Sequence, residues 1–151
     1  MKAVIQRVTR AAVTINGGER RAIGPGLVVL LGVADTDTLD VCPKLAGKIA
    51  GLRVFEDAGG KLNLSAEEKG YEALVVSNFT LYGDTRKGKR PSFIRAAKPP
   101  LSVEAYEEFV RCLRATGLSR VETGAFGADM QLELVNDGPV TIVIETNDWT
   151  R

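Results

Sequence analysis

Side chains that could do chemistry collect first in one short segment, Ser77-Asn78-Phe79-Thr80-Leu81-Tyr82-Gly83. It follows an apolar run, so its main-chain N–H groups and the Thr80 hydroxyl could face a cleft at the end of a strand. A nucleophilic Thr80 needs a base, and the chain contains no histidine. A lysine or a carboxylate could serve, but neither is adjacent in sequence. The alternative is a strand that simply ends in polar residues, and composition leaves both interpretations open.

The absence of histidine excludes whole classes of site. It removes Ser-His-Asp and Cys-His nucleophile systems, imidazole general bases and His-containing zinc sites. The two cysteines, Cys42 and Cys112, lie 70 positions apart, so no Cys-x-x-Cys pair exists. We expect both thiols to fill the core beside apolar helix faces. We therefore expect neither a metal nor a cofactor.

A second segment, Asn136-Asp137-Gly138-Pro139-Val140-Thr141, separates two apolar runs. The pattern predicts a hairpin turn between strands at residues 130–135 and 140–145. Since most X-Pro bonds in folded proteins are trans, the pattern alone predicts a trans Gly138–Pro139 bond.

Charge is unevenly distributed, although the net charge is only +1. Residues 85–98 hold six basic side chains and no acidic one, among them Arg86, Lys87, Lys89 and Arg90. This segment is either a solvated loop or a surface that contacts a polyanion.

The elements that must position these segments form a strand-rich α+β domain. A chain of 151 residues predicts one domain, residues 1–151. Apolar periodicity predicts strands at residues 1–8, 12–15, 20–23, 27–33, 52–55, 62–64, 73–76, 120–122, 130–135 and 140–145. Most connections are too short for crossovers, which favours antiparallel pairing.

Two amphipathic helices complete the expected domain. The first has an apolar stripe at residues 42–49 with Asp40 as its N-cap, and the second a stripe at residues 106–113 with Ser102 as its N-cap. The N-terminus lacks an apolar signal core, and no apolar run approaches the length of a membrane span. We therefore expect a cytoplasmic protein that does not contact a membrane.

Two motifs together give the sequence a family resemblance. Residues 77–81 are similar to the signature Ser-Gln-Phe-Thr-Leu, and residues 136–141 match Asn-x-Gly-Pro-Val-Thr. With residues 1–15, 53–65 and the chain length, they make the chain resemble the D-aminoacyl-tRNA deacylases of bacterial and eukaryotic type, also called D-tyrosyl-tRNA deacylases. The resemblance covers essentially the whole chain. Asn78 stands where the family has Gln, which keeps the amide on a side chain one methylene shorter.

The resemblance implies a homodimeric esterase that removes D-amino acids from mischarged tRNA. The implied fold is a compact β-barrel-like domain flanked by two helices, with each active site at the dimer interface. There, Gly138 and Pro139 of one subunit, joined by a cis bond, would enter the partner's pocket. Their main-chain carbonyls would hold the substrate's α-amino group and reject an L side chain. Arg7 would brace this motif, and Phe126 and Met130 would lie near the terminal adenosine.

The resemblance also implies how the ester is cleaved. Phe79, in the motif with Ser77 and Asn78, would present its main-chain N–H to the scissile carbonyl. The favoured interpretation has the terminal 2′-hydroxyl of the tRNA assisting, with Thr80 as an alternative nucleophile. Glycyl-tRNA, including glycine mischarged on tRNA-Ala, would be cleaved as well. The basic residues Arg86, Lys87, Lys89 and Arg90 would contact tRNA phosphates. A non-catalytic RNA-binding module remains the third hypothesis.

Overall fold

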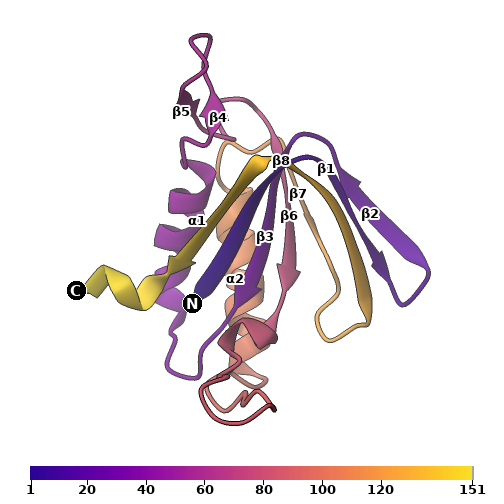
Figure 1. Cartoon of the computed structure of the whole chain (residues 1–151), viewed down its shortest axis with the longest axis vertical. Helices are drawn as coiled ribbons and strands as arrows, with labels where there is room; N and C mark the ends of the chain where they lie inside the picture. The colour runs from indigo at the N-terminus through magenta and orange to yellow at the C-terminus, as the bar shows by residue number, and fades with distance from the viewer. Residues whose placement is uncertain (151) are drawn as a thin grey trace.

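A six-stranded sheet organises the chain, and the computed structural model describes residues 1–150 (Figure 1). Its strand order is β2-β1-β3-β6-β7, with β8 pairing to β1, while β4 and β5 form a small second sheet. The elements in chain order are β1 (Lys2–Ile15), β2 (Glu19–Ile23), β3 (Gly26–Gly32), the 3-10 helix η1 (Leu39–Val41), α1 (Cys42–Ala50), β4 (Phe55–Glu56), β5 (Leu62–Leu64), β6 (Glu72–Ser77), the 3-10 helix η2 (Phe79–Tyr82), α2 (Leu101–Arg114), β7 (Arg120–Thr123), β8 (Met130–Glu145) and the 3-10 helix η3 (Thr146–Thr150).

The long strand β1 holds the sheet together through both of its edges. One edge pairs antiparallel with β3 along residues 2–8 and with β2 along residues 11–15. The other edge pairs antiparallel with β8, from Lys2 opposite Glu145 to Ile15 opposite Met130. The prediction of separate strands at residues 1–8 and 12–15 is therefore wrong, because one continuous strand serves two successive partners.

Parallel pairing enters the sheet through β6, which lies between β3 and β7. α1 and the β4–β5 hairpin connect β3 to β6, and α2 connects β6 to β7, so both links are crossovers of the length that parallel strands require. The result is a nearly closed mixed β-barrel with two helices, as the predicted fold class requires. The antiparallel bias holds for the three pairings of β1, and the crossovers are what the short-connection argument missed.

Both helices lie against one face of the sheet, where the larger core forms (Figure 1). Fully buried side chains from the helices and the strands meet there, among them Leu27, Leu31, Leu45, Ile49, Phe109 and Leu113. Cys42 and Cys112 are free and buried, which confirms the prediction that they fill the core. Burial raises the pKa of the Cys42 thiol to about 12, so it stays protonated. No helix within residues 1–150 is long and apolar enough to cross a membrane.

The predicted N-caps of both helices are wrong. Asp40 lies inside η1, and the N-cap of α1 is Val41, followed by a proline in the first turn. Since proline has no N–H, one of the donors that a cap would satisfy is missing there. α2 starts at Leu101 directly after Pro100, so Ser102 lies one residue inside the helix. The second helix ends at Arg114, so it contains the whole predicted apolar stripe of residues 106–113.

The predicted hairpin between residues 130–135 and 140–145 is also wrong. β8 runs through this segment as one strand paired to β1, with Asn136 opposite Val8 and Thr141 opposite Gln6. From Gln6 to Val8 the chain of β1 advances two residues, whereas from Asn136 to Thr141 the chain of β8 advances five. Three extra residues of β8 therefore bulge out of the ladder. The turn-forming residues, Asp-Gly-Pro, mark this bulge and not a reversal of the chain.

Candidate active site

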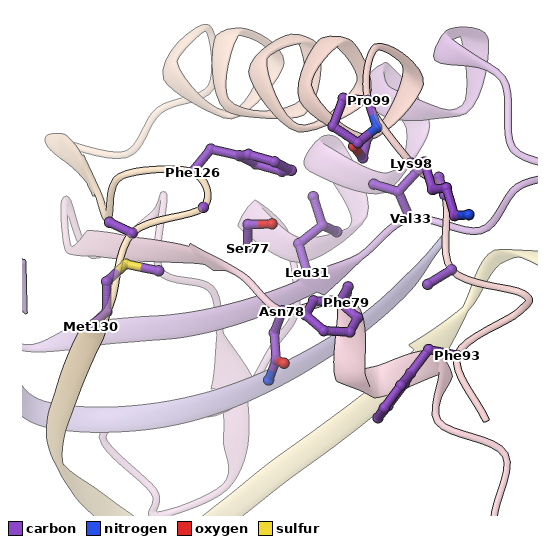
Figure 2. Close-up of a pocket in the computed structure, with 15 residues that line it drawn as sticks. Leu31, Val33, Ser77, Asn78, Phe79, Phe93, Lys98, Pro99, Phe126 and Met130 are labelled. Carbon is purple, nitrogen blue, oxygen red and sulfur yellow. The ribbon is translucent and has the colours of Figure 1, made fainter. Parts of the chain in front are cut away.

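The end of β6 opens into a cavity of about 460 Å³. Figure 2 shows Phe126 and Met130 on one side of it and Lys98 and Pro99 on the other. Its wall is mostly apolar, and its polar side chains are Ser77, Asn78, Ser102 and Lys98. The lining residues are Leu31, Val33, Ser77, Asn78, Phe79, Phe93, Ala96, Ala97, Lys98, Pro99, Ser102, Phe126, Gly127, Ala128 and Met130.

The turn η2 is fixed to the sheet where β6 ends. The Asn78 main-chain N–H donates to the Leu31 carbonyl at 2.8 Å, one residue beyond the last β3–β6 pair. Gly32 lets η2 pack directly on β3, because a Cβ there would lie 3.2 Å from the Asn78 carbonyl oxygen and 3.1 Å from the Leu81 Cβ. The β6 strand and this glycine therefore set where Phe79 and Thr80 stand.

Thr80 is exposed, and its hydroxyl donates to the Asn78 Oδ1 at 2.5 Å. No lysine or carboxylate within residues 1–150 is hydrogen-bonded to it, and Thr80 does not line the cavity. The Asn78 amide, one methylene shorter than the family glutamine, thus supports the turn from within.

The main-chain N–H groups of Phe79 and Thr80 open η2, where a helix leaves its first donors without internal acceptors. Within the described part of the chain, neither N–H makes a hydrogen bond. Phe79 lines the cavity, the residue is 56% exposed, and its ring meets Phe93 edge to face with centroids 5.2 Å apart. Two unpaired donors therefore open η2, and the first of them belongs to Phe79, which lines the apolar cavity.

Phe126 is placed by α2 and β6. Its ring packs against Tyr106 at a centroid distance of 6.0 Å, and the Tyr106 hydroxyl donates to the Val75 carbonyl at 3.0 Å. Burial raises the pKa of Tyr106 to about 12, so this phenol stays neutral and continues to donate.

Arg7 and the β8 bulge form a separate polar hollow of about 240 Å³. Arg7 is buried, and its Nε donates to the Asp137 carbonyl and its Nη1 to the Val54 carbonyl, each at 2.8 Å. Asn136 closes the bulge, since its Oδ1 accepts from the Val140 N–H at 2.8 Å. Arg7 thereby ties the bulge to the loop before β4.

Gly138 and Pro139 are exposed at the tip of this bulge. Gly138 has φ +142°, a backbone conformation that side-chain-bearing residues rarely adopt. The Gly138–Pro139 bond is cis, which corrects the trans expectation from the pattern alone and matches what the family resemblance implied.

The predicted site residues therefore fall into three places. Ser77, Asn78, Phe79, Phe126 and Met130 share the cavity, with Thr80 next to Phe79 outside it. Arg7 lines the separate hollow, with Gly138 and Pro139 on the bulge beside it. The basic residues Arg86, Lys87, Lys89 and Arg90 lie on the exposed loop between η2 and α2.

Sequence reasoning missed ten of the fifteen residues of the cavity wall, among them Phe93, Lys98 and Ser102. Phe93 and Lys98 belong to the basic segment, whose charge predicts a phosphate surface but does not indicate that it covers a cavity. Ser102 was assigned to a cap. Its Oγ is the only buried side-chain polar atom within residues 1–150 that has no hydrogen-bond partner.

Comparison with known proteins defines the class of the chain. Residues 4–145 match the family model described as D-Tyr-tRNA(Tyr) deacylase. The chain belongs to this family, the D-aminoacyl-tRNA deacylases, which are hydrolases. It is 56% identical over 146 residues to a D-aminoacyl-tRNA deacylase of Desulfatibacillum aliphaticivorans, covering 97% of this chain and 99% of that one.

Two solved structures share the fold. One, titled c-Myc DNA Unwinding Element Binding Protein, has a TM-score of 0.89 at 46% identity, and the match covers 96% of this chain and 98% of that one. The other, described as a probable eukaryotic D-amino acid tRNA deacylase, has a TM-score of 0.84 at 18% identity, with 95% and 97% covered.

Proposed function

We propose that the cavity beside Phe79 hydrolyses the ester of D-aminoacyl-tRNA, releasing a free D-amino acid and tRNA. The observation that carries this proposal is the unpaired main-chain N–H of Phe79, followed directly by that of Thr80, at a residue that lines a pocket with no carboxylate in its wall. Such donors stabilise the oxyanion that forms when an ester is attacked, and each contributes about 2.7–4 kcal/mol in measured cases. Aminoacyl esters are activated, so a catalyst without side-chain bases suffices.

The nucleophile is then supplied with help from the substrate. The terminal ribose carries a 2′-hydroxyl next to the ester, where it assists the attacking water. Phe126 and Met130 offer an apolar wall and an aromatic face to the terminal adenosine, the kind of surface on which unpaired bases stack. The chain itself contributes position and two main-chain donors.

Chiral selection comes from a second copy of the chain. The Gly138–Pro139 bulge is exposed and does not line the cavity of its own chain, so it reaches a cavity only in a partner. A two-fold symmetric homodimer gives each cavity one bulge. The bulge carbonyls hold the α-amino group, and the bulge leaves no room for an L side chain. Glycine has no side chain to reject, so glycyl-tRNA, including glycine on tRNA-Ala, is cleaved too.

The exposed basic loop supplies phosphate contacts for the tRNA body. Lys87, Lys89 and Arg90 form no salt bridge within residues 1–150, whereas Arg86 is held by Asp84 at 2.7 Å. The Arg86 guanidinium lowers the pKa of Asp84 to about 2, so this pair stays charged. Such contacts position RNA without reading its sequence.

Two alternatives have support of their own. A Thr80 nucleophile is favoured by the side chain's position one residue after Phe79, but the only hydrogen bond found for its hydroxyl within residues 1–150 goes to an amide oxygen, and an amide is no base. A non-catalytic nucleic-acid-binding module is favoured by the basic loop and by the name of the 46% identical solved structure. That module predicts binding that weakens with salt and no turnover.

One assay tests the function. The purified protein is given D-, L- and glycyl-tRNA at equal concentrations, and release of free amino acid is followed. We expect cleavage of the D and glycyl esters and negligible cleavage of the L ester, because only an L side chain meets the bulge. Salt-sensitive tRNA binding without turnover would instead support the binding module.

A further inference from the structure

A second hollow lies at the far end of η2 from Phe79, and nothing in the proposed chemistry uses it. It has a volume of about 350 Å³ and is lined by Lys2, Tyr82, Gly83, Asp84, Thr85, Arg86 and Arg95. Three cations from β1 and from the basic loop therefore meet at one place, although they are far apart in the sequence.

The buried Tyr82 ring lies under two of these cations. The Lys2 Nζ is 5.0 Å from the ring centroid, and the Arg95 guanidinium carbon is 5.8 Å from it. Burial raises the pKa of Tyr82, so its ring stays a neutral platform. The cations are thus held by an aromatic face, which fixes them without neutralising their charge.

One carboxylate, Asp84, lines the hollow, and Glu145, which does not line it, contacts Lys2 and Tyr82. Arg86 chiefly lowers the pKa of Asp84, and Arg95 helps but forms no salt bridge with it. Asp84 is bound by Arg86, and Glu145 lies 3.8 Å from Lys2 and accepts from the Tyr82 hydroxyl. Arg95 has no carboxylate within salt-bridge distance among residues 1–150. Arg95 is exposed and planar, and its guanidinium presents a fork of donors that suits a phosphate.

The loop of Arg95 also forms part of the proposed active site. Phe93, Ala96, Ala97 and Lys98 line the large cavity, while Asp84, Thr85, Arg86 and Arg95 line the hollow. η2 separates the two spaces by a single 3-10 turn, about 6 Å of rise from Phe79 to Tyr82. A strand whose last nucleoside enters the cavity can therefore place a neighbouring phosphate over Tyr82.

We propose that the Tyr82 hollow binds a backbone phosphate from the single-stranded 3′ end of the tRNA, with Arg95 as its principal ligand and Lys2 beside it. This inference rests on the proposed function for the identity of the RNA. Alternatively, the single-stranded end of the tRNA could leave the cavity on the other side, past Phe126, where Arg111 and Arg114 line another hollow of about 370 Å³. That course is less favourable, because Arg111 is paired with Glu108 at 2.5 Å and Arg114 donates to the Val121 carbonyl.

The test uses binding of uncharged tRNA as a function of salt. Each phosphate neutralised on a single strand contributes about 0.7 to the slope of log K against log salt. We expect Arg95→Gln to lower that slope by about this amount, while Arg95→Lys retains it because the charge remains. Lys48 is an exposed cation on α1 whose side chain has no hydrogen bond or salt bridge within residues 1–150, so Lys48→Gln is the matched control and should leave the slope unchanged.

Kinetics separate this inference from the proposed function. We expect Arg95→Gln to raise KM for D-aminoacyl-tRNA several-fold at unchanged kcat, and to leave cleavage of a D-aminoacyl ester of adenosine unaffected, since that ester carries no phosphate. The phosphate site would be refuted if Arg95→Gln kept the wild-type slope of log K against log salt, or if Lys48→Gln lowered that slope equally. A loss in Arg114→Gln alone would place the strand past Phe126. A wild-type protein that cleaves neither ester would refute the proposed function, and the slope would still decide the phosphate site.

Discussion

At the residue scale, the surroundings of Thr80 do not support the nucleophilic role that its residue type suggests. A threonine in a turn beside a pocket is a candidate nucleophile. However, the Thr80 hydroxyl donates a hydrogen bond to Asn78, and no base is hydrogen-bonded to it within residues 1–150. The main-chain donors of the same turn are what remain unpaired. The absence of histidine, which first excluded imidazole chemistry, is consistent with a site built on main-chain groups.

This gives a direct prediction for Thr80. Thr80→Ala should retain most of the deacylation rate, because the main-chain N–H groups survive the change. A D-aminoacyl-tRNA with a 2′-deoxy terminal ribose should be nearly inert with the unchanged protein, because the assisting hydroxyl is gone. Single-turnover rates measure both. If instead Thr80→Ala loses all activity while Thr80→Ser retains it, the hydroxyl is the nucleophile.

The cavity residues that lie in a sequence motif could be predicted from the sequence, and those outside a motif could not. Ser77, Asn78 and Phe79 were identifiable from the strand end, whereas Phe93 and Lys98 were not. Those two reach the cavity because their loop folds back over η2, and no local pattern encodes that return. Phe126 and Met130 were assigned through the resemblance alone.

At the element scale, β1 shows why the positions of strands are easier to predict than the strands they pair with. Alternation revealed its two halves, but pairing with β2, β3 and β8 depends on contacts distant in sequence. The Asp-Gly-Pro segment was assigned to a hairpin because its local signals are those of a turn. β8 instead continues along β1, since pairing on both sides of the bulge outweighs the local preference.

The parallel pairing of β3 with β6 yields a prediction about Gly26. A Cβ at Gly26 would collide with the main chain of Glu72, which is backbone and cannot move aside cheaply. We expect Gly26→Ala to lower the free energy of unfolding by on the order of 1–3 kcal/mol. Urea denaturation measures it.

Gly47 provides the matched control for that substitution. It lies within α1, and nothing would come within 4 Å of an added Cβ. Gly47→Ala should therefore stabilise the protein by up to about 1 kcal/mol through helix propensity. Equal effects at the two glycines would show that the close approach of β3 and β6 carries no energetic weight.

At the scale of the whole molecule, the parts of the proposed site lie apart within one chain. The cavity and the Gly138–Pro139 bulge occupy separate places. The two motifs identified the family from sequence because both are local strings of residues. Their separation within one chain could not be predicted, since it depends on how β8 runs along β1 and where β6 ends.

The bulge can be removed with little disturbance to the sheet. Deleting residues 137–139 leaves two residue steps on β8 opposite two on β1 between Gln6 and Val8, which removes that register shift and leaves the smaller one between Val8 and Arg10 in place. A bulge-deleted homodimer should lose its preference for D over L esters. Ala128→Trp, at a half-buried position in the cavity wall, should block the cavity and abolish turnover. Circular dichroism checks that both variants fold.

The most direct measurement combines these two chains in one heterodimer, co-expressed with different affinity tags and purified through both. Its only open cavity belongs to the bulge-deleted chain, and its only bulge belongs to the cavity-blocked chain. If the bulge acts on the partner's cavity, the heterodimer should cleave D-aminoacyl-tRNA at about half the wild-type rate per dimer and spare the L ester. Cleavage of both esters, as in the bulge-deleted homodimer, would contradict the account.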